Sequence, residues 1–222
     1  MNNRLGIIGA GGHAKVVIDA IEAGANEWSI VGLFDDAAGR HGEMVLGYSV
    51  LGDTSLKELR THGLAAIFVA IGENSVREQI VRRLEPWFHW PTIIHPNAFV
   101  SRHATIEKGS LVCAGATIQV AARIGRFAII NTAASVDHDC VIEDFTHLGP
   151  GVHLGGSVSI AEGGFLGVGA SVLPSLSVGK WSLVGAGSVV TRSVGQYLTV
   201  VGSPAKPHDL ALPKTVGSSQ IT

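Results

Sequence analysis

Three histidines lie close together in the sequence, and one of them has an aspartate on each side. His138, His147 and His153 fall within sixteen residues, and His138 stands between Asp137 and Asp139. A carboxylate beside an imidazole can fix its tautomer and stabilise the imidazolium that forms when the ring accepts a proton. The sequence therefore predicts that His138 is a general base, suited to removing a proton from an attacking amine or hydroxyl group near neutral pH.

A glycine-rich turn near the N-terminus has the pattern of a phosphate-binding loop. Gly9, Gly11 and Ala14 match the G-x-G-x-x-A form of the dinucleotide fingerprint, and the acidic pair Asp35 and Asp36 follows about twenty residues later. Such glycines let backbone N–H groups approach a pyrophosphate at a helix N-terminus. The pattern alone is weak, and an ordinary turn between strand and helix is the alternative.

Size favours one nucleotide over two at this turn. A complete dinucleotide fold needs two mononucleotide halves with about six strands in all, and the first 93 residues have room for about one half. We therefore predict a nucleotide diphosphate ligand, held by Gly11, Gly12, His13 and the two aspartates. His13 can donate to a phosphate or sugar oxygen; alternatively, it is a helix-start histidine that faces water.

The elements that position these residues follow from a repeat of six. Counting in sixes gives seventeen branched aliphatic residues in succession: Ile94, Val100, Ile106, Val112, Ile118, Ile124, Ile130, Val136, Ile142, Leu148, Leu154, Ile160, Leu166, Val172, Val178, Val184 and Val190. A second register, four residues further on in each hexad, holds mostly small residues. A period of six fits neither an α-helix nor a hairpin sheet, and it is typical of a parallel β-helix whose repeats stack around one core.

Three hexads make one triangular coil, so eighteen residues return the chain to the same face, about 4.8 Å higher. Residues 94–195 then form between five and six coils. Zinc binding by three histidines is one further interpretation of the histidine cluster, but Val120 and Gly156 occupy the positions eighteen residues from His138. His147 and His153, one hexad apart, fall on different faces, so no metal site is expected. Histidines that fill an oligomer interface are the remaining interpretation.

The first 93 residues alternate between strand and helix patterns, which implies a parallel sheet. Strands are predicted at 4–9, 29–34 and 65–71, and helices at 16–24, 56–62 and 75–84. The predicted domains are a half-Rossmann-like α/β domain at 1–85, a linker at 86–93, an all-β parallel β-helix at 94–195, and a cap and tail at 196–222.

Composition argues against several classes of partner. The formal net charge is −2, 15% of the residues are charged, and no basic block exists, which disfavours nucleic acid and anionic membranes. No run of eighteen apolar residues occurs, and the first residues lack a signal-peptide cleavage pattern, so no membrane insertion and a cytoplasmic location are predicted. Cys113 and Cys140 are too few for a disulfide framework and are predicted to be small buried residues.

The glycine turn GAGGHAK, the hexads, the segment NTAASVDHDCVIEDFTHLGPG and the tail VVGSPAK together resemble the two-domain sugar acetyltransferases. These include the bacterial UDP-4-amino-sugar N-acetyltransferases and the sialic acid O-acetyltransferases, and the resemblance spans residues 4–207. It implies a left-handed β-helix and a homotrimer. It also implies a nucleotide-linked sugar on the N-terminal domain and acetyl-CoA, as co-substrate, between two β-helices.

The resemblance also assigns roles to individual residues. His138 matches the general base, and Asp139 matches its acidic partner, which is often a glutamate. Gly156, one coil above His138, matches the glycine whose backbone N–H faces the thioester carbonyl. Asn131 and His147 match polar residues that line the acetyl and sugar site, Asn131 on the side of the sugar and His147 on the side of acetyl-CoA.

Further residues match the coenzyme A groove of the family. Gly155 would share the opening beside Gly156, and Gly185 and Ala186 would leave room for the pantetheine arm. Lys206 would pair with a phosphate of the nucleotide end, or else is a solvated lysine.

The predicted reaction is transfer of acetyl from acetyl-CoA to the amino group of a nucleotide-linked sugar. The closest rival is O-acetylation of a sialic acid or another sugar hydroxyl. A non-catalytic or zinc-binding β-helix protein is the rival from another class.

Overall fold

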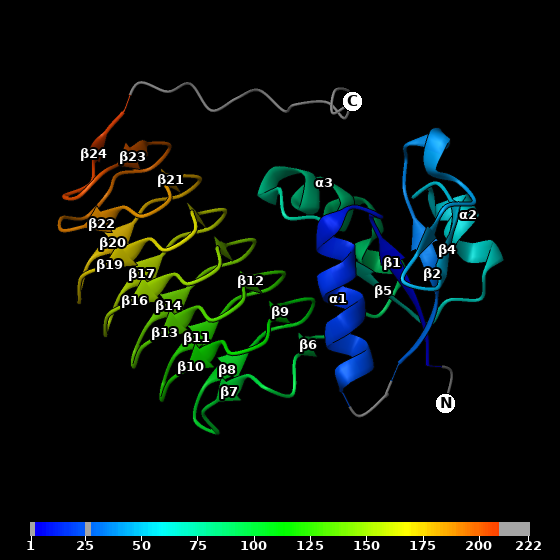
Figure 1. The fold of residues 1–222 in the computed structure, drawn as a ribbon, viewed down its shortest axis with the longest axis horizontal. Coiled ribbons are helices and arrows are strands. Elements are labelled where there is room, and N and C mark those ends of the chain that lie inside the picture. Colours follow the sequence, from blue (N-terminus) through cyan, green and yellow to red (C-terminus); the bar gives the residue numbers. More distant parts are fainter. Residues whose placement is uncertain (1–2, 25–27, 209–222) are drawn as a thin grey trace.

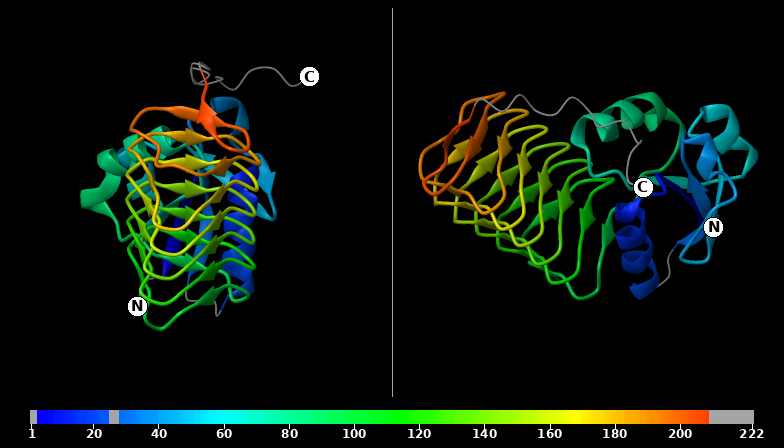
Figure 2. Two further views of the ribbon diagram at one scale, coloured as in Figure 1. Left: turned by 90° about the vertical axis from the view of Figure 1, so that its left-hand side faces the viewer. Right: turned by 45° about the horizontal axis from the view of Figure 1, so that its top comes forward.

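The computed structural model describes residues 3–24 and 28–208. The chain forms an α/β region followed by a prism of stacked coils, and helix α1 (Gly12–Ala23) lies between them (Figures 1 and 2). No helix in the described part of the chain is both long and apolar enough to cross a membrane.

The α/β region contains a five-stranded sheet in the order β3-β4-β2-β1-β5. Besides α1, the elements of the α/β region in chain order are β1 (Arg4–Ile8), β2 (Ser29–Phe34), η1 (Ala38–Arg40), β3 (Met44–Val45), β4 (Tyr48–Gly52), α2 (Leu56–Thr61), β5 (Ala66–Val69), α3 (Asn74–Leu84) and η2 (Glu85–Trp87). Strands β4, β2, β1 and β5 are parallel neighbours. Their order corresponds to the 3-2-1-4 half of a Rossmann sheet. The predicted half-Rossmann-like α/β fold is therefore confirmed.

Side chains on the two faces of the sheet enter different cores. Leu5 and Ile7 of β1 pack with α1, whereas Ile8 packs with residues of α2 and α3. The helix that follows the glycine turn begins at Gly12, earlier than predicted. His13 is therefore in the first turn of a helix and not in a loop.

The prism has three flat faces, which we number by their strands. Face 1 consists of β7 (Phe99–Val100), β10 (Thr117–Ile118), β13 (Ser135–Val136), β16 (His153–Leu154), β19 (Ser171–Val172) and β22 (Val189–Val190). Face 2 consists of β8 (Thr105–Ile106), β11 (Arg123–Ile124), β14 (Val141–Ile142), β17 (Ser159–Ile160) and β20 (Ser177–Val178). Face 3 consists of β6 (Ile93–Ile94), β9 (Leu111–Val112), β12 (Ile129–Ile130), β15 (His147–Leu148), β18 (Phe165–Leu166), β21 (Leu183–Val184), β23 (Thr199–Val201) and β24 (Lys206–Pro207).

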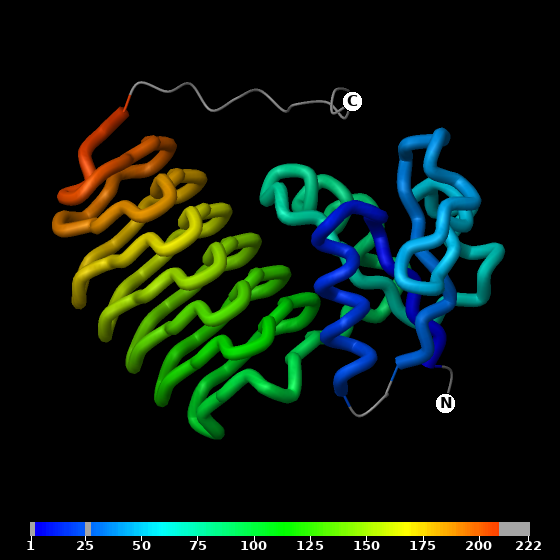
Figure 3. Tube along the Cα trace, in the orientation of Figure 1, coloured from blue at the N-terminus to red at the C-terminus, as the bar shows by residue number. Residues whose placement is uncertain are grey.

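The register follows the eighteen-residue arithmetic of the hexads. On face 1, Thr117 pairs with Ser135, and Ser135 pairs with His153, all in parallel. Figure 3 shows the coils stacked along the prism.

From β9 to β22, the second residue of each strand points into the prism and belongs to the buried core, together with small residues of the second register. Val100 and Ile106 in the first coil are only partly buried, and Ile94 is exposed, although the hexad pattern predicted an inward position for it. The last coil is two residues shorter, since Val178 bridges to Val194.

Corners of the prism carry residues with positive φ at the same spacing. The corner between faces 1 and 2, the 1/2 corner, has Ala121, Asp139, Ser157 and Ser175 in this conformation. The 2/3 corner has Gly109, Phe127, Phe145, Gly163 and Trp181, and the 3/1 corner has Gly115, Ala133, Gly151, Gly169 and Gly187. Each coil therefore turns through left-handed residues, and many of these are not glycine.

Face 3 is the side of the prism that packs against the α/β region. Leu111, Cys113 and Ile129 join the core that contains α1. Phe127 and Phe145 of the 2/3 corner join the core that contains α3. Both layers of the α/β region therefore contact the β-helix.

Candidate active site

The 1/2 corner holds a hydrogen-bonded histidine–aspartate pair. Nδ1 of His138 lies 2.8 Å from Oδ2 of Asp139, and both side chains are more than half exposed. Because a carboxylate only accepts, Nδ1 carries the proton of the neutral ring and Nε2 is left as the basic atom. The backbone N–H of His138 donates to Asp137, which fixes the start of the turn.

The charge environment suits a proton acceptor. The hydrogen bond that His138 donates to Asp139 raises the pKa of His138 above the ordinary histidine value. Partial desolvation opposes this, and the negative charges of Asp137 and Asp139 add to the rise. The imidazolium formed by proton uptake is thus stabilised where it forms.

Gly156 lies one coil above His138, as the spacing predicts, and the imidazole occupies the space that a side chain there would need. A Cβ on Gly156 would stand 2.5 Å from Nε2 of His138. Glycine therefore makes room for the base itself. Gly156 is buried, and no described group accepts a hydrogen bond from its N–H. A buried N–H without a partner is costly, and it is a ready donor to an oxygen that gains negative charge.

Gly155 has a different steric reason. A Cβ there would meet the ring of Pro174, one coil above, at 2.8 Å. Its carbonyl accepts a hydrogen bond from Sγ of Cys140, and this thiol is buried.

A second polar cluster lies where face 3 meets the α/β region. Nδ1 of His147 donates to the carbonyl of Gly72 at 3.0 Å, and Nε2 accepts from Nδ2 of Asn131 at 3.1 Å. Oδ1 of Asn131 accepts from the N–H of Thr132, which fixes the orientation of the amide. Both nitrogens of His147 are therefore engaged within the chain, and the ring packs edge-on against Phe165.

His13 completes this cluster from helix α1. Its ring centroid lies 6.1 Å from that of His147, and its Nε2 is buried without a hydrogen-bond partner. Burial, with a smaller contribution from the positive charge of Arg77, lowers the pKa of His13 to about 4. The same two causes, in the same order, lower the pKa of His147 to about 3. Both rings are neutral at physiological pH, and the unpartnered Nε2 is available to a ligand.

The cluster stands at the switch point of the sheet. The loops after β1 and β5 diverge there, and ligands of open α/β sheets bind at such places. Gly9, with φ of 96°, approaches Ile71 so closely that its Cβ would lie 2.9 Å from Cγ1. At Gly11 and Gly12 no atom lies within 4 Å of a Cβ position, so both remain open to a ligand.

The acidic pair is engaged by the backbone. Asp35 accepts from the N–H of Ala10 at 2.9 Å and from that of Ala37, and thus holds the glycine turn. Asp36 accepts from the N–H and hydroxyl of Thr54. In this arrangement both carboxylates orient loops around the crevice.

The two clusters do not meet within one chain. His138 occupies the 1/2 corner, opposite face 3. His147 lies on face 3, and His13 lies on helix α1, which packs against that face. Gly185 and Ala186 lie at the 3/1 corner, on the other edge of face 1 from His138, and Lys206 is exposed on β24. Residues predicted for one site thus occupy separate sides of the prism.

The third histidine has another setting. His153 is exposed on face 1, and its Nδ1 lies 2.8 Å from Oγ of Ser135. His138, His147 and His153 thus point to three different places. Among residues 3–24 and 28–208, no group of three or more His, Cys, Asp or Glu side chains is arranged to hold a metal ion.

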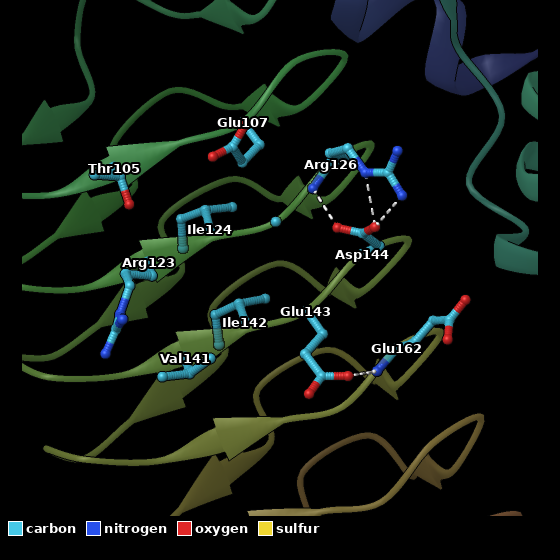
Figure 4. Close-up of a pocket in the computed structure, with 11 residues that line it drawn as sticks. Thr105, Glu107, Arg123, Ile124, Arg126, Val141, Ile142, Glu143, Asp144 and Glu162 are labelled. Carbon is cyan, nitrogen blue, oxygen red and sulfur yellow. Dashed lines mark hydrogen bonds and ion pairs between the residues drawn. The ribbon is translucent and has the colours of Figure 1, made fainter. Parts of the chain in front are cut away.

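A surface hollow of about 480 Å³ lies on face 2 (Figure 4). Charged residues line it, among them Arg126, which pairs with Asp144, and Glu143, which accepts from the N–H of Glu162. None of the histidines of either cluster lines this hollow, so it is separate from the candidate chemistry.

Known proteins resemble this chain in sequence and in fold. Residues 4–84 match the PglD N-terminal domain family. A variant of perosamine N-acetyltransferase from Caulobacter crescentus, solved with CoA and GDP-perosamine, is 42% identical with a TM-score of 0.86, covering 92% of this chain and 96% of that one. The acetyltransferase domain of PglB from Neisseria gonorrhoeae, solved with acetyl coenzyme A, is 38% identical with a TM-score of 0.85, covering 94% and 100%.

Curated relatives match over shorter stretches. A serine acetyltransferase from Bacillus pumilus (strain SAFR-032) is 36% identical over 111 residues, which are 46% of this chain and 51% of that protein. The chain spans between 31% and 51% of the length of the first curated relatives that it matches.

An α/β fold followed by stacked parallel strands is the architecture of the hexapeptide-repeat acetyltransferases, and the predicted left-handed β-helix is confirmed. The chain belongs to the hexapeptide-repeat sugar N-acetyltransferase family.

Sequence reasoning missed Gly72, Asn74 and Arg77, which join the second cluster to the β-helix. No signal identified them, since an arginine and an asparagine at the start of an amphipathic helix usually face solvent. Only the docking of the helix on the prism shows their role.

Proposed function

We propose that this protein transfers acetyl from acetyl-CoA to the amino group of a nucleotide-linked sugar. The observation that carries the proposal is the 1/2 corner, where the basic Nε2 of His138 lies against Gly156, whose N–H has no partner among the described residues. A proton acceptor and an oxyanion donor in adjacent coils are the two groups that acyl transfer to an amine requires.

Acetyl-CoA would supply a thioester carbonyl to this corner. His138 would take the proton from the attacking amine through Nε2, while Asp139 holds the opposite nitrogen and stabilises the positive ring. The N–H of Gly156 would donate to the carbonyl oxygen as it becomes negative. The C–S bond would then break, so that coenzyme A leaves as a thiolate and takes up the proton held by His138. A fixed donor of this kind needs no reorganisation during the reaction.

The switch-point crevice is the proposed place for the nucleotide diphosphate. The open positions of Gly11 and Gly12 at the N-terminus of α1 suit a phosphate, because the first N–H groups of a helix lack intrahelical partners. His13 offers a buried, unpartnered Nε2 to the sugar or phosphate. The GDP-linked sugar in the C. crescentus structure supports a nucleotide sugar as the substrate class.

The proposed enzyme is a homotrimer whose sites form between subunits. The 1/2 corner and the crevice lie on opposite sides of one prism, so a base from one chain would serve a sugar bound to the next. Such an arrangement would also bring the 3/1 corner, with Gly185 and Ala186, into a cleft between prisms that buries coenzyme A. Lys206 would pair with a coenzyme A phosphate.

The test is CoA release with a panel of nucleotide-linked amino sugars, their hydroxyl analogues and free amino sugars. We expect turnover with a nucleotide-linked amine, and a loss of a hundredfold or more, on the order of a general base's contribution, in His138→Ala. His103→Ala, at an exposed histidine of the β-helix, is the control. Turnover of only the hydroxyl analogue would favour O-acetylation, and near-normal activity in His138→Ala would remove His138 as the base.

A further inference from the structure

A buried arginine in the first turn of α3 joins the two parts of the molecule. Arg77 is 1% exposed, and every acceptor around its guanidinium is an uncharged oxygen. Nε donates to Phe127 at 2.9 Å, Nη1 to the carbonyls of Ile71 and Gly72, and Nη2 to the carbonyl of Phe145 and to Oδ1 of Asn74. Burial lowers the pKa of Arg77 to about 9, so the guanidinium remains charged at neutral pH.

The carbonyls on the β-helix side belong to successive coils of the 2/3 corner. Arg77 binds Phe127 and Phe145, and Nδ2 of Asn74 donates to Gly163 at 3.0 Å, so the three acceptors are spaced by eighteen residues. One guanidinium and one amide thus fix α3 across three coils. A planar fork of five N–H donors makes this geometry possible, and an ammonium group could not reproduce it.

The same guanidinium fixes the loop that follows β5. The Gly72 carbonyl accepts from Nη1 of Arg77 at 3.3 Å and from Nδ1 of His147 at 3.0 Å. The direction of the Gly72 carbonyl therefore decides which nitrogen of His147 carries the proton. With the proton on Nδ1, Nε2 is left to accept from Asn131.

We propose that Arg77 is a positioning residue for the nucleotide-sugar crevice, because it holds the Gly72 carbonyl that sets the tautomer and orientation of His147 beside His13. This inference rests on the proposed function of the crevice. The groups that face the two rings are His13 from α1, Asn131 and Phe165 from face 3, the Gly72 loop, and Arg77 from α3. The negative charge of Glu73 acts against burial and raises the pKa of Arg77. Among these groups Arg77 supplies the positive charge that favours neutral rings.

Steady-state kinetics of two variants test the role of Arg77. Arg77→Lys keeps the positive charge but removes the planar guanidinium, and Arg77→Gln removes the charge. We expect both variants to raise KM for the nucleotide sugar by about tenfold, the cost of a misplaced hydrogen-bonding group. The value of kcat and the KM for acetyl-CoA should stay within about twofold, because the 1/2 corner is not touched. Arg82→Gln is the matched control, since Arg82 lies on the same helix with a 68% exposed side chain that pairs with Glu78. A lower melting temperature with unchanged KM would reduce Arg77 to a purely structural residue and overturn the proposal.

Imidazole ¹⁵N spectra of the wild-type protein provide a readout that needs no variant. We expect His147 to be neutral, with Nδ1 protonated and Nε2 bare, from pH 8 down to about 5. Protonation on Nε2 would overturn the proposal, even if both Arg77 variants failed to fold. If no nucleotide-linked amine were acetylated, the proposed function would fail by itself, while these spectra would still decide the tautomer.

Discussion

Two carboxylates flank His138, but only that of Asp139 is hydrogen-bonded to the ring, so the two aspartates should act differently on activity. Protonated His138 cannot accept a proton, so kcat/KM should rise with pH through its pKa. Asp139→Asn removes the negative hydrogen-bond partner, and asparagine tolerates the positive φ of this position. We expect the acidic limb of the pH profile to move to lower pH, because the raised pKa of His138 returns toward its ordinary value.

Asp137→Asn is the comparison, since Asp137 contributes charge but no hydrogen bond to the ring. In Asp137→Asn, the acidic limb of the pH profile should move in the same direction but by less. An acidic limb that stays in place in Asp139→Asn would mean that another group, such as the substrate amine, controls the profile.

Gly156→Ala tests the contact between successive coils at the active corner. The added methyl group would collide with the imidazole of His138 and displace the base. We expect kcat to fall by about a hundredfold, the scale of a lost general base, with KM for the nucleotide sugar little changed. Gly39→Ala is the control, because no atom lies near its Cβ position and its φ is ordinary. Normal kcat in Gly156→Ala would show that the ring needs no such space.

At the scale of single residues, the sequence was sufficient to predict the contact at His138 but not the contacts of His147. The spacing of eighteen placed Gly156 above His138 because both belong to the same repeat. The setting of His147 could not be predicted, because its partner is the carbonyl of Gly72, and backbone acceptors in loops leave no trace in residue type. Its predicted role beside coenzyme A stays a prediction, since its place in one chain is at the crevice.

At the scale of elements, the hexads predicted nearly every strand of the prism, because each coil repeats one local rule of inside and outside. The hairpin of β3 and β4 was missed, since β3 has only two residues and the five residues of β4 show no strict alternation of apolar and polar side chains. The shortened last coil was missed as well, because the chain leaves the hexad pattern there.

Corner residues allow a test of the strain in the coils. Ala133 is exposed and has φ of 54°, and the other four positive-φ residues of the 3/1 corner are glycine. Ala133→Gly should stabilise the protein by about 0.5–1 kcal/mol, because left-handed strain is relieved at some cost in chain entropy. Urea denaturation gives the free energy of unfolding. The neighbouring Ala134→Gly should destabilise the protein instead, since Ala134 is buried in the core. If both variants changed the free energy of unfolding in the same direction, strain at the 3/1 corner would be refuted.

At the scale of the whole molecule, the buried histidines link stability to pH. The unfolded chain binds a proton on each histidine below about pH 6.5, whereas the pKa values in the folded protein are about 4 for His13 and about 3 for His147. The unfolded state therefore binds more protons as the pH falls, so stability is complete above pH 6.5 and is lost toward pH 3–4. At pH 5 each ring should cost about 2 kcal/mol.

His147→Asn keeps a donor for Gly72 and removes the titrating ring. Its free energy of unfolding should fall less between pH 7.5 and 5 than that of the wild type, as measured in urea. His103→Asn, at an exposed position, should behave as the wild type does. Equal pH dependence in all three proteins would contradict the link to the buried ring.

Mixed oligomers test whether the sites form between chains. If His138 and His13 of different subunits serve one site, co-expression of His138→Ala with His13→Ala should restore about a quarter of the sites at random assembly. Activity would be measured at a nucleotide-sugar concentration far below KM. Co-expression of His138→Ala with Gly156→Ala is the control, because both changes affect the same corner and no site can be complete. Equal activity of the two mixtures would place the whole site in one chain.

The docking of the α/β region on the prism could not be predicted from sequence. Repeats and fingerprints fix each part by local patterns, whereas the joint depends on Arg77, Asn74 and carbonyls from three coils.

That joint also determines which changes of length the chain can absorb. The hydrogen bonds of α3 end at Gly164, so a block of eighteen residues could be gained or lost beyond this point, and the crevice would keep its distance from the 1/2 corner. An insertion of one or two residues between Phe127 and Gly163 would instead rotate the acceptors away from the guanidinium. In related genes, insertions and deletions should therefore comprise whole coils of eighteen residues near the C-terminal end of the β-helix. They should be absent from the segment that is hydrogen-bonded to α3.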